Sequence, residues 1–227
     1  MHQVDLIEDV AIAYGYNNIE PSWRELPTTG RPKLDQRLID VARDLMVGLG
    51  YQEILNYTLT NQENLFDKMS VQRQRIVEVS NPKVVTMTCL RSWMLPSTME
   101  FLSNNKSAEF PQKIFELGKI TLPDETKETK VREENWLCAA TLHASAGFSE
   151  IKSALDSFFS NFGVQWQIQE TAHPSFIEGR VGKVIVNSSE IGVVGEISPA
   201  VLEAWKLENP VAAFELNFQR ILKSKLG

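Results

Sequence analysis

The stretch NPKVVTMTCLRSWMLPSTMEFLSNNKSAEFPQKIFELGKITLP, residues 81–123, is the most informative part of the sequence, because it combines an extended entry, an amphipathic helix and a strand. Leu95-Pro96 marks the predicted helix start, since a proline at the first helical position gives up an amide that would have no partner there. Apolar residues then recur at helical spacing as far as Leu102. Residues 113–122 form a largely apolar run between two prolines, which predicts a strand.

Outward from this stretch, helices and strands are predicted in mixed order. The predicted helices cover residues 4–14, 33–49, 60–69, 148–162 and 199–205. The predicted strands cover residues 51–59, 75–79, 136–144, 164–170, 181–186, 191–197 and 210–218. Asn187-Ser188-Ser189 reads as a hairpin turn between two of these strands. The fold class predicted from this mixture is α+β with a mainly antiparallel sheet.

Local signals refine the boundaries of these elements. Thr60 and Glu63 have the spacing of a capping box, which predicts the start of the helix over 60–69. Residues 123–135 are charged and mixed in sign, and we expect an exposed hairpin connection there. Residues 173–180 are predicted to form a loop, and residues 223–227 a tail.

Composition limits the classes of function that this sequence can serve. The chain has 227 residues and a net charge of −6, with acids and bases interspersed, so it lacks the basic face of a general nucleic-acid binder. Cys89 and Cys138 lie inside apolar runs, where buried reduced thiols are expected; a disulfide or a metal pair is the alternative. His143 ends a strand and is interpreted as a satisfied core or edge histidine. No run reaches the roughly 18 apolar residues of a membrane span, and we expect a cytoplasmic protein.

The helix over residues 4–14 carries an acidic cluster. Asp5, Glu8 and Asp9 stand at positions i, i+3 and i+4, so their carboxylates share one side of the helix. Carboxylates placed in this way can share a hard cation together with waters. The alternative is a solvated acidic first turn, which is favourable beside the positive end of the helix dipole.

Six motifs in order resemble the β subunit of phenylalanyl-tRNA synthetase, of the archaeal and eukaryotic-cytosolic type. They are AIAYGYNNI (11–19), VSNPK (79–83), LRSWMLP (90–96), FELGK (115–119), Gly179-Arg180 and GEISPAVL (195–202). The resemblance implies a class II aminoacyl-tRNA synthetase-like sheet flanked by helices. It also implies three regions: the end of a preceding magnesium-associated module (1–19), a linker (20–32) and a core domain (33–227).

The same resemblance implies a domain without catalytic residues of its own. A catalytic class II core places an ATP-binding arginine and an acid where this chain has residues 118–121, Gly-Lys-Ile-Thr. It places another arginine on a helix after a glycine-rich strand, but here the strand at 192–196 is followed by Ser198-Pro199. Arg91 and Arg180 are therefore expected to orient loops or to form ion pairs.

The family resemblance also implies partners and a cofactor. We expect an α2β2 heterotetramer in which the α subunit activates phenylalanine with ATP and charges tRNA(Phe), while this domain supports it. Residues 33–59 resemble the helix-and-strand unit that builds the subunit interface in this family, and the isolated chain is expected to self-associate through it. Asp5, Glu8 and Asp9 match an Mg²⁺-associated cluster whose fourth acidic ligand would lie upstream of this sequence.

A different class of function remains open at this point. The alternative is a self-sufficient ligating enzyme, or an amino-acid- or nucleotide-binding protein, on the same class II-like fold, because fold alone does not decide function. An RNA-binding module is a weaker alternative, because the net charge of −6 disfavours it.

Overall fold

The computed structural model describes residues 2–23, 25 and 29–226. The chain divides into two compact units, Met1–Lys33 and Leu34–Gly227, and each is described by itself. The predicted linker at 20–32 lies partly outside the described residues, and the final residue of the predicted tail lies wholly outside them.

The first unit contains one α-helix and one short 3-10 helix. Helix α1 spans Gln3–Tyr14, as predicted, and η1 spans Tyr16–Asn18. Gly15 separates them with φ +92°, a conformation that glycine adopts without steric cost. No residue of α1 is buried within the structure, although the helix has several large apolar side chains.

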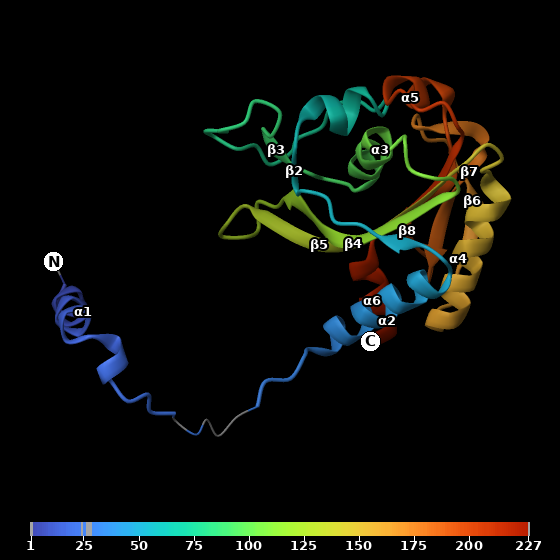
Figure 1. Cartoon of the computed structure of the whole chain (residues 1–227). Helices are drawn as coiled ribbons and strands as arrows, with labels where there is room; N and C mark the ends of the chain where they lie inside the picture. Colours follow the sequence, from blue (N-terminus) through green and yellow to red (C-terminus); the bar gives the residue numbers. More distant parts are fainter. Residues whose placement is uncertain (1, 24, 26–28, 227) are drawn as a thin grey trace. The chain divides into compact units, whose positions relative to one another are not determined.

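The second unit is built on one twisted sheet (Figure 1). Seven strands of the described residues pair in the order β1-β4-β5-β9-β8-β7-β6. Their bounds are β1 Gln52–Glu53, β4 Gln112–Pro123, β5 Val131–Leu142, β6 Gln167–Glu170, β7 Phe176–Val186, β8 Ser189–Ile197 and β9 Val211–Leu216. The β1–β4 pair is parallel and the others are antiparallel. The predicted α+β class with a mainly antiparallel sheet is therefore confirmed.

Helices cover both faces of this sheet (Figure 1). Helices α2 (Leu34–Gly48), α4 (Phe148–Phe162) and α6 (Phe218–Leu226) pack on one face, in a core with Phe115 and Phe214. Helices α3 (Leu95–Asn104) and α5 (Pro199–Ala204) pack on the other, in a core with Ala140 and Ala213. Side chains alternate between the faces along each strand, so β9, which is buried along its whole length, contributes to both cores.

Turn and cap residues behave largely as their chemistry predicts. Asn187 and Ser188 have φ values of +48° and +62°, the two left-handed residues that a tight hairpin turn needs. The hydroxyl of Ser198 accepts from the amide of Val201 at 3.5 Å and caps α5. Pro96 lies in the first turn of α3, as predicted.

The segment 51–90 corrects the strand prediction. The expected strand over 51–59 is reduced to β1 and to a two-residue strand β2 (Leu59–Thr60), which pairs with β3 (Cys89–Leu90). The expected strand over 75–79 is a single bridge between Glu78 and Cys89. A strand needs a neighbour along its whole length, and the sequence does not show whether one is present.

The predicted capping box at Thr60 is wrong. Thr60 is buried in β2, and the cap is Asn61, whose Oδ1 accepts from the amide of Asn64 at 2.8 Å. The helix that follows is one π-helical turn, η2 (Glu63–Asp67), rather than a helix over 60–69.

Further boundaries differ from the prediction. β5 begins at Val131, inside the hairpin connection predicted over 123–135, and β6 covers only Gln167–Glu170 of the strand predicted over 164–170. β7 begins at Phe176, inside the predicted loop, and its pairing with β8 shifts register between Phe176 and Val181. The predicted tail belongs to α6, which is anchored because Phe218, Ile221 and Leu222 recur at helical spacing and are buried against the sheet. Among the described residues, no helix is both long and apolar enough to cross a membrane.

Candidate functional site

Arg91 lies just before α3, and its guanidinium is buried inside the second unit. Its Nη2 donates to Oε1 of Glu116 at 2.7 Å, and its Nε donates to the carbonyl of Lys119 at 2.9 Å. Both charged side chains are 2% exposed. The prediction that Arg91 forms an ion pair is confirmed.

Gly118 makes room for this ion pair. A Cβ added at Gly118 would lie 2.6 Å from Nη2 of Arg91 and 2.8 Å from Oε1 of Glu116, closer than any side chain can approach without displacing them. The second oxygen of Glu116 accepts from Asn56 Nδ2 at 2.8 Å. Within the described residues, Nη1 of Arg91 has no hydrogen-bond partner. A glycine is therefore needed at this position of FELGK for a steric reason, which the sequence alone did not reveal.

A second buried carboxylate, Glu215 of β9, joins the sheet to α3. Its two oxygens accept from the amides of Met94 and Leu95, at 2.7 and 2.9 Å. Burial raises the pKa of Glu215, and the two amides and Arg91 lower it, with a net value of about 7. Glu215 is not among the residues predicted from the sequence. The available signal was a single carboxylate in the apolar run VAAFEL, because a buried acid needs a partner.

The remaining positions of the Gly-Lys-Ile-Thr segment are engaged within the chain. Lys119 pairs with Glu133 across the β4–β5 hairpin at 2.7 Å, on the exposed side. Ile120 is buried in the core beside α3. Thr121 is buried, and its amide donates to the carbonyl of Arg91 at 3.0 Å.

Arg180, the other arginine predicted to form an ion pair, also does so. Its Nη1 lies 2.7 Å from Oε2 of Glu196. The other oxygen of Glu196 accepts from the amide of Phe148 at 2.8 Å, at the start of α4. Arg180 thereby orients the residue that caps a core helix.

His143 is satisfied at the sheet edge, as interpreted from sequence. Its Nε2 lies 2.7 Å from Oε2 of Glu150, whose Oε1 pairs with Lys113 at 2.8 Å. Burial raises the pKa of Glu150, but Lys113 and His143 lower it more, so that the pKa lies below its usual value. Both cysteines are free and buried, which confirms the interpretation as reduced thiols.

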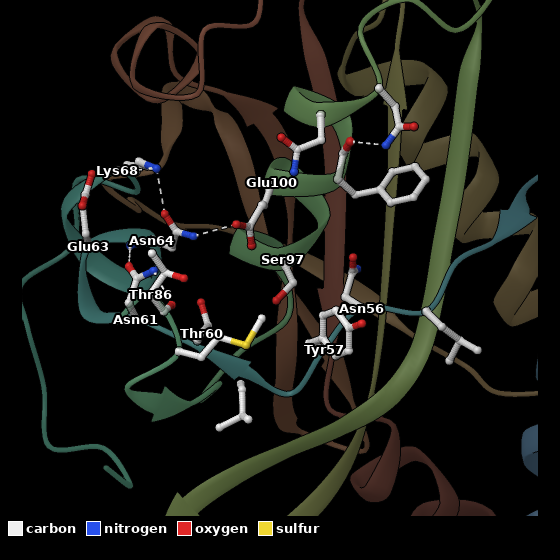
Figure 2. A pocket seen from close by; sticks show the side chains of 16 residues that line it. Asn56, Tyr57, Thr60, Asn61, Glu63, Asn64, Lys68, Thr86, Ser97 and Glu100 are labelled. Carbon is white, nitrogen blue, oxygen red and sulfur yellow. Dashed lines mark hydrogen bonds and ion pairs between the residues drawn. The ribbon is translucent and has the colours of Figure 1, made fainter. Parts of the chain in front are cut away.

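A polar groove of about 500 Å³ lies between residues 55–64 and α3 (Figure 2). Asn64 lines one side of it: its Nδ2 donates to Glu100 Oε1 at 3.0 Å, and its Oδ1 accepts from Lys68 Nζ at 2.7 Å. Tyr57, at the edge of the groove, is 78% exposed. The groove offers amide and carboxylate groups for hydrogen bonding, and sequence analysis did not identify it because its walls come from separate segments.

The predicted metal ligands Asp5, Glu8 and Asp9 all lie on α1 and are exposed. Oδ2 of Asp5 accepts from the amide of His2 at 2.6 Å, at the helix N-terminus. Over the described residues, no group of three or more His, Cys, Asp or Glu side chains has the arrangement to hold a metal ion. The three carboxylates are the hard oxygen donors that Mg²⁺ prefers, but the structure does not bring them together into a site.

Comparison with known families gives a match over most of the chain. The family described as the phenylalanyl tRNA synthetase beta chain CLM domain matches residues 19–218. The chain belongs to this family. The resemblance inferred from six sequence motifs is thereby confirmed.

Relatives of this phenylalanyl-tRNA synthetase beta-chain family include several archaeal proteins. The phenylalanine-tRNA ligase beta subunit of Pyrococcus abyssi is 51% identical over 216 residues, 95% of this chain and 39% of that protein. The beta subunit of Pyrococcus furiosus is 49% identical over the same shares of the two chains. That of Thermofilum pendens is 38% identical over the whole of this chain and 41% of its own length. The chain spans about two fifths of the length of these relatives.

Proposed function

We propose that this chain is the non-catalytic core domain of a phenylalanine-tRNA ligase β subunit, which supports the α subunit that activates phenylalanine with ATP and charges tRNA(Phe). The main support for this proposal is the burial of Arg91 and its hydrogen bonds within the protein. A cation that stabilises a transferring phosphoryl group must face the substrate. Arg91 instead donates to Glu116 and to the carbonyl of Lys119, and it is 2% exposed.

The α+β architecture supports a class II synthetase-like fold for this domain. The unit formed by α2 and β1 corresponds to the helix and strand that build the subunit interface in that fold. α2 buries Ile39 and Met46 against the sheet, yet Val41 and Val47 on the same helix are exposed. Exposed aliphatic side chains beside a packed face are typical of a surface that meets another subunit. This supports assembly through α2 into an α2β2 heterotetramer, which would act in the cytoplasm.

The first unit fits the end of a larger module. Leu6, Ile7 and Val10 of α1 are exposed, and apolar side chains of a stable helix normally pack against something. We assign residues 1–19 to a preceding magnesium-associated module, 20–32 to a linker and 33–227 to the core domain. In the longer subunit, Asp5, Glu8 and Asp9 would hold Mg²⁺ together with a further acid.

Phenylalanine-dependent ATP–pyrophosphate exchange tests the proposal. The chain alone is expected to be inactive, and to co-elute with the α subunit in an assembly that is active. Exchange by the chain alone would instead establish the alternative, a self-sufficient ligating enzyme.

A matched pair of variants locates the contact. Val47→Arg places a charge on the exposed apolar side of α2 and is expected to abolish co-elution. Gln36→Arg changes a polar residue of the same helix, one that donates to Asp40, and is expected to leave co-elution intact. Equal behaviour of the two variants would exclude α2 as the interface.

A further inference from the structure

A second cavity, of about 550 Å³, lies over strands β5, β8 and β9. Trp136 and Val193 of its lining pack with the core on the α3 side of the sheet, whereas Ile191 belongs to the core on the other side. Trp93 and His173 form another wall, with their ring centroids 6.1 Å apart. We call this cavity the sheet pocket. Its volume is in the range of pockets that hold small molecules.

The aromatic walls offer ring surface rather than polar atoms. The indole Nε1 of Trp93 donates to the carbonyl of Leu65 at 3.1 Å. The indole Nε1 of Trp136 donates to Oε2 of Glu134, also at 3.1 Å. Because both indole N–H groups are satisfied within the protein, these side chains are left to contact a planar apolar group by stacking or edge contact.

The acids that line the sheet pocket are largely satisfied by the protein. Glu134 accepts from Arg132, Trp136 and Asn217, at 2.9, 3.1 and 2.8 Å. Glu215 accepts from the first amides of α3. Glu190 is the exposed acid of the lining, and it lies 4.0 Å from Lys183. The lining thus holds three acids, two of which already accept several hydrogen bonds from the protein.

Two arginines provide spare donors at the same pocket. Arg132 lines it, donates from Nε to Glu134 and has Nη1 3.8 Å from Oδ2 of Asp124, and its side chain is 43% exposed. Arg220, in the first turn of α6, donates from Nη1 to the carbonyl of Glu190 at 2.7 Å, which holds its guanidinium at the pocket wall. A guanidinium has five N–H donors, so most donors of each arginine stay available to an anion.

His173 adds a neutral donor. Its Nδ1 accepts from the amide of Ser175 at 3.2 Å, which places the ring proton on Nε2. Burial lowers the pKa of His173, so the ring is neutral at pH 7. Besides Glu190, the groups that can contact a ligand are thus apolar rings, the remaining donors of two arginines and a neutral imidazole.

We propose that the sheet pocket binds a small molecule that combines a planar apolar ring with an anionic group. Nucleotides and aromatic carboxylates both have this chemistry. The inference goes beyond the proposed function, because it concerns binding by this chain without turnover. A negative result would leave the exchange and co-elution results of the whole assembly untouched.

Matched ligands test the inference by isothermal titration and tryptophan fluorescence. AMP is compared with adenosine, and phenylalanine with phenylalaninamide, since each pair shares the ring and differs in the anionic group. At least one anionic member is expected to bind about tenfold more tightly than its partner, with an affinity that falls as salt is raised. Binding of the nucleotide alone or of the amino acid alone identifies the source. No binding, or equal binding within both pairs, would overturn the proposal.

A matched pair of arginine variants tests whether the ligand binds in the sheet pocket. Arg220→Gln is expected to weaken the anionic ligand about tenfold. Arg180→Gln changes an arginine that forms an ion pair elsewhere and does not line the pocket, and it is expected to have no effect. Urea midpoints check that both variants are folded. An equal loss of affinity in both variants would refute a ligand site here. So would a loss of ligand binding whenever the α subunit is bound, because a segment of the partner would then fill the pocket.

Discussion

Arg91 and Glu116 form an ion pair of 2.7 Å in which each side chain is 2% exposed. A charge left alone at such a depth is costly, because neither water nor a counter-ion reaches it. We therefore expect Arg91→Ala to lower the free energy of unfolding by about 3–5 kcal/mol, measured by urea denaturation. In the assembled enzyme the variant is expected to reduce folding or assembly rather than a chemical step.

An exposed arginine provides the control for this prediction. Arg73 pairs with Asp67 at the surface, where solvent screens the charges, so Arg73→Ala is expected to leave the free energy of unfolding nearly unchanged. Comparable losses in both variants would contradict a special role for burial. A selective loss of ATP affinity in Arg91→Ala, with assembly intact, would contradict the non-catalytic assignment.

Gly118 is expected to tolerate no side chain while Arg91 is present. Gly118→Ala would place Cβ 2.6 Å from Nη2 of Arg91 and should cost about 1–3 kcal/mol by crowding. Thermal unfolding of the single and double variants measures the coupling: in an Arg91→Ala background the added methyl group should cost much less. Gly48→Ala is the control, because a Cβ there meets no atom within 4 Å. Additive effects at 91 and 118 would argue against direct contact.

Glu215 is expected to make stability depend on pH. Its pKa in the folded chain is about 7, against an ordinary value of 4.5. Since the folded state holds the proton more tightly, the stabilisation is complete below pH 4.5 and is lost as the pH rises through 7. At 1.36 kcal/mol per pKa unit, the loss is about 3 kcal/mol. Urea unfolding at a series of pH values measures it.

Glu215→Gln is the variant for this titration, because the amide side chain has the same shape and no ionisation. It keeps one of the two acceptor oxygens, so the comparison concerns the pH dependence and not the absolute stability. Its unfolding free energy should lack the decline that the native chain shows. His173, whose lowered pKa acts in the opposite sense below pH 6.5, is present in both proteins, so the difference between the two curves isolates Glu215. Parallel curves would show that Glu215 titrates normally.

We expect the acidic cluster on α1 to bind a metal ion only within a longer subunit. Asp5, Glu8 and Asp9 lie on one helix without forming a site here. In the full-length subunit, changing all three to their amides should remove one bound Mn²⁺, used as a Mg²⁺ probe and counted by electron paramagnetic resonance. Glu20→Gln, a nearby acid outside the cluster, is the control. Unchanged Mn²⁺ stoichiometry would leave the cluster as a solvated helix face.

Sequence patterns predicted the elements whose stability is set by their own periodicity. α4 and β4 carry long apolar patterns, and both were expected within one or two residues of their bounds. α6 was missed because lysines and a serine separate its apolar residues, and its helical spacing only becomes meaningful once a sheet face lies beneath it. The strand predicted over 75–79 is absent because no strand of the described residues pairs with it along its length; Glu78 alone forms a bridge, with Cys89.

The candidate site was predicted only in part, for a similar reason. Arg91 was singled out from the sequence, but its partner Glu116 and the space above Gly118 depend on how β4 lies against the start of α3. Glu215 is more than 120 residues from the amides that it binds at Met94, so no local pattern connects them. The walls of the sheet pocket come from equally distant segments.

The place of β9 in the sheet has a consequence for biosynthesis. β9, which follows the other strands of the described sheet in the sequence, pairs with β5 on one side and β8 on the other, and it alone joins the two halves of that sheet. A ribosome therefore releases the central strand after every other strand. Until then β5 and β8 have unpaired edges that can cause aggregation, and the first amides of α3 lack the carboxylate of Glu215. A stop codon shortly before Val211 would remove the join between the halves, and the truncated protein is expected to be a client of chaperones rather than a shortened domain.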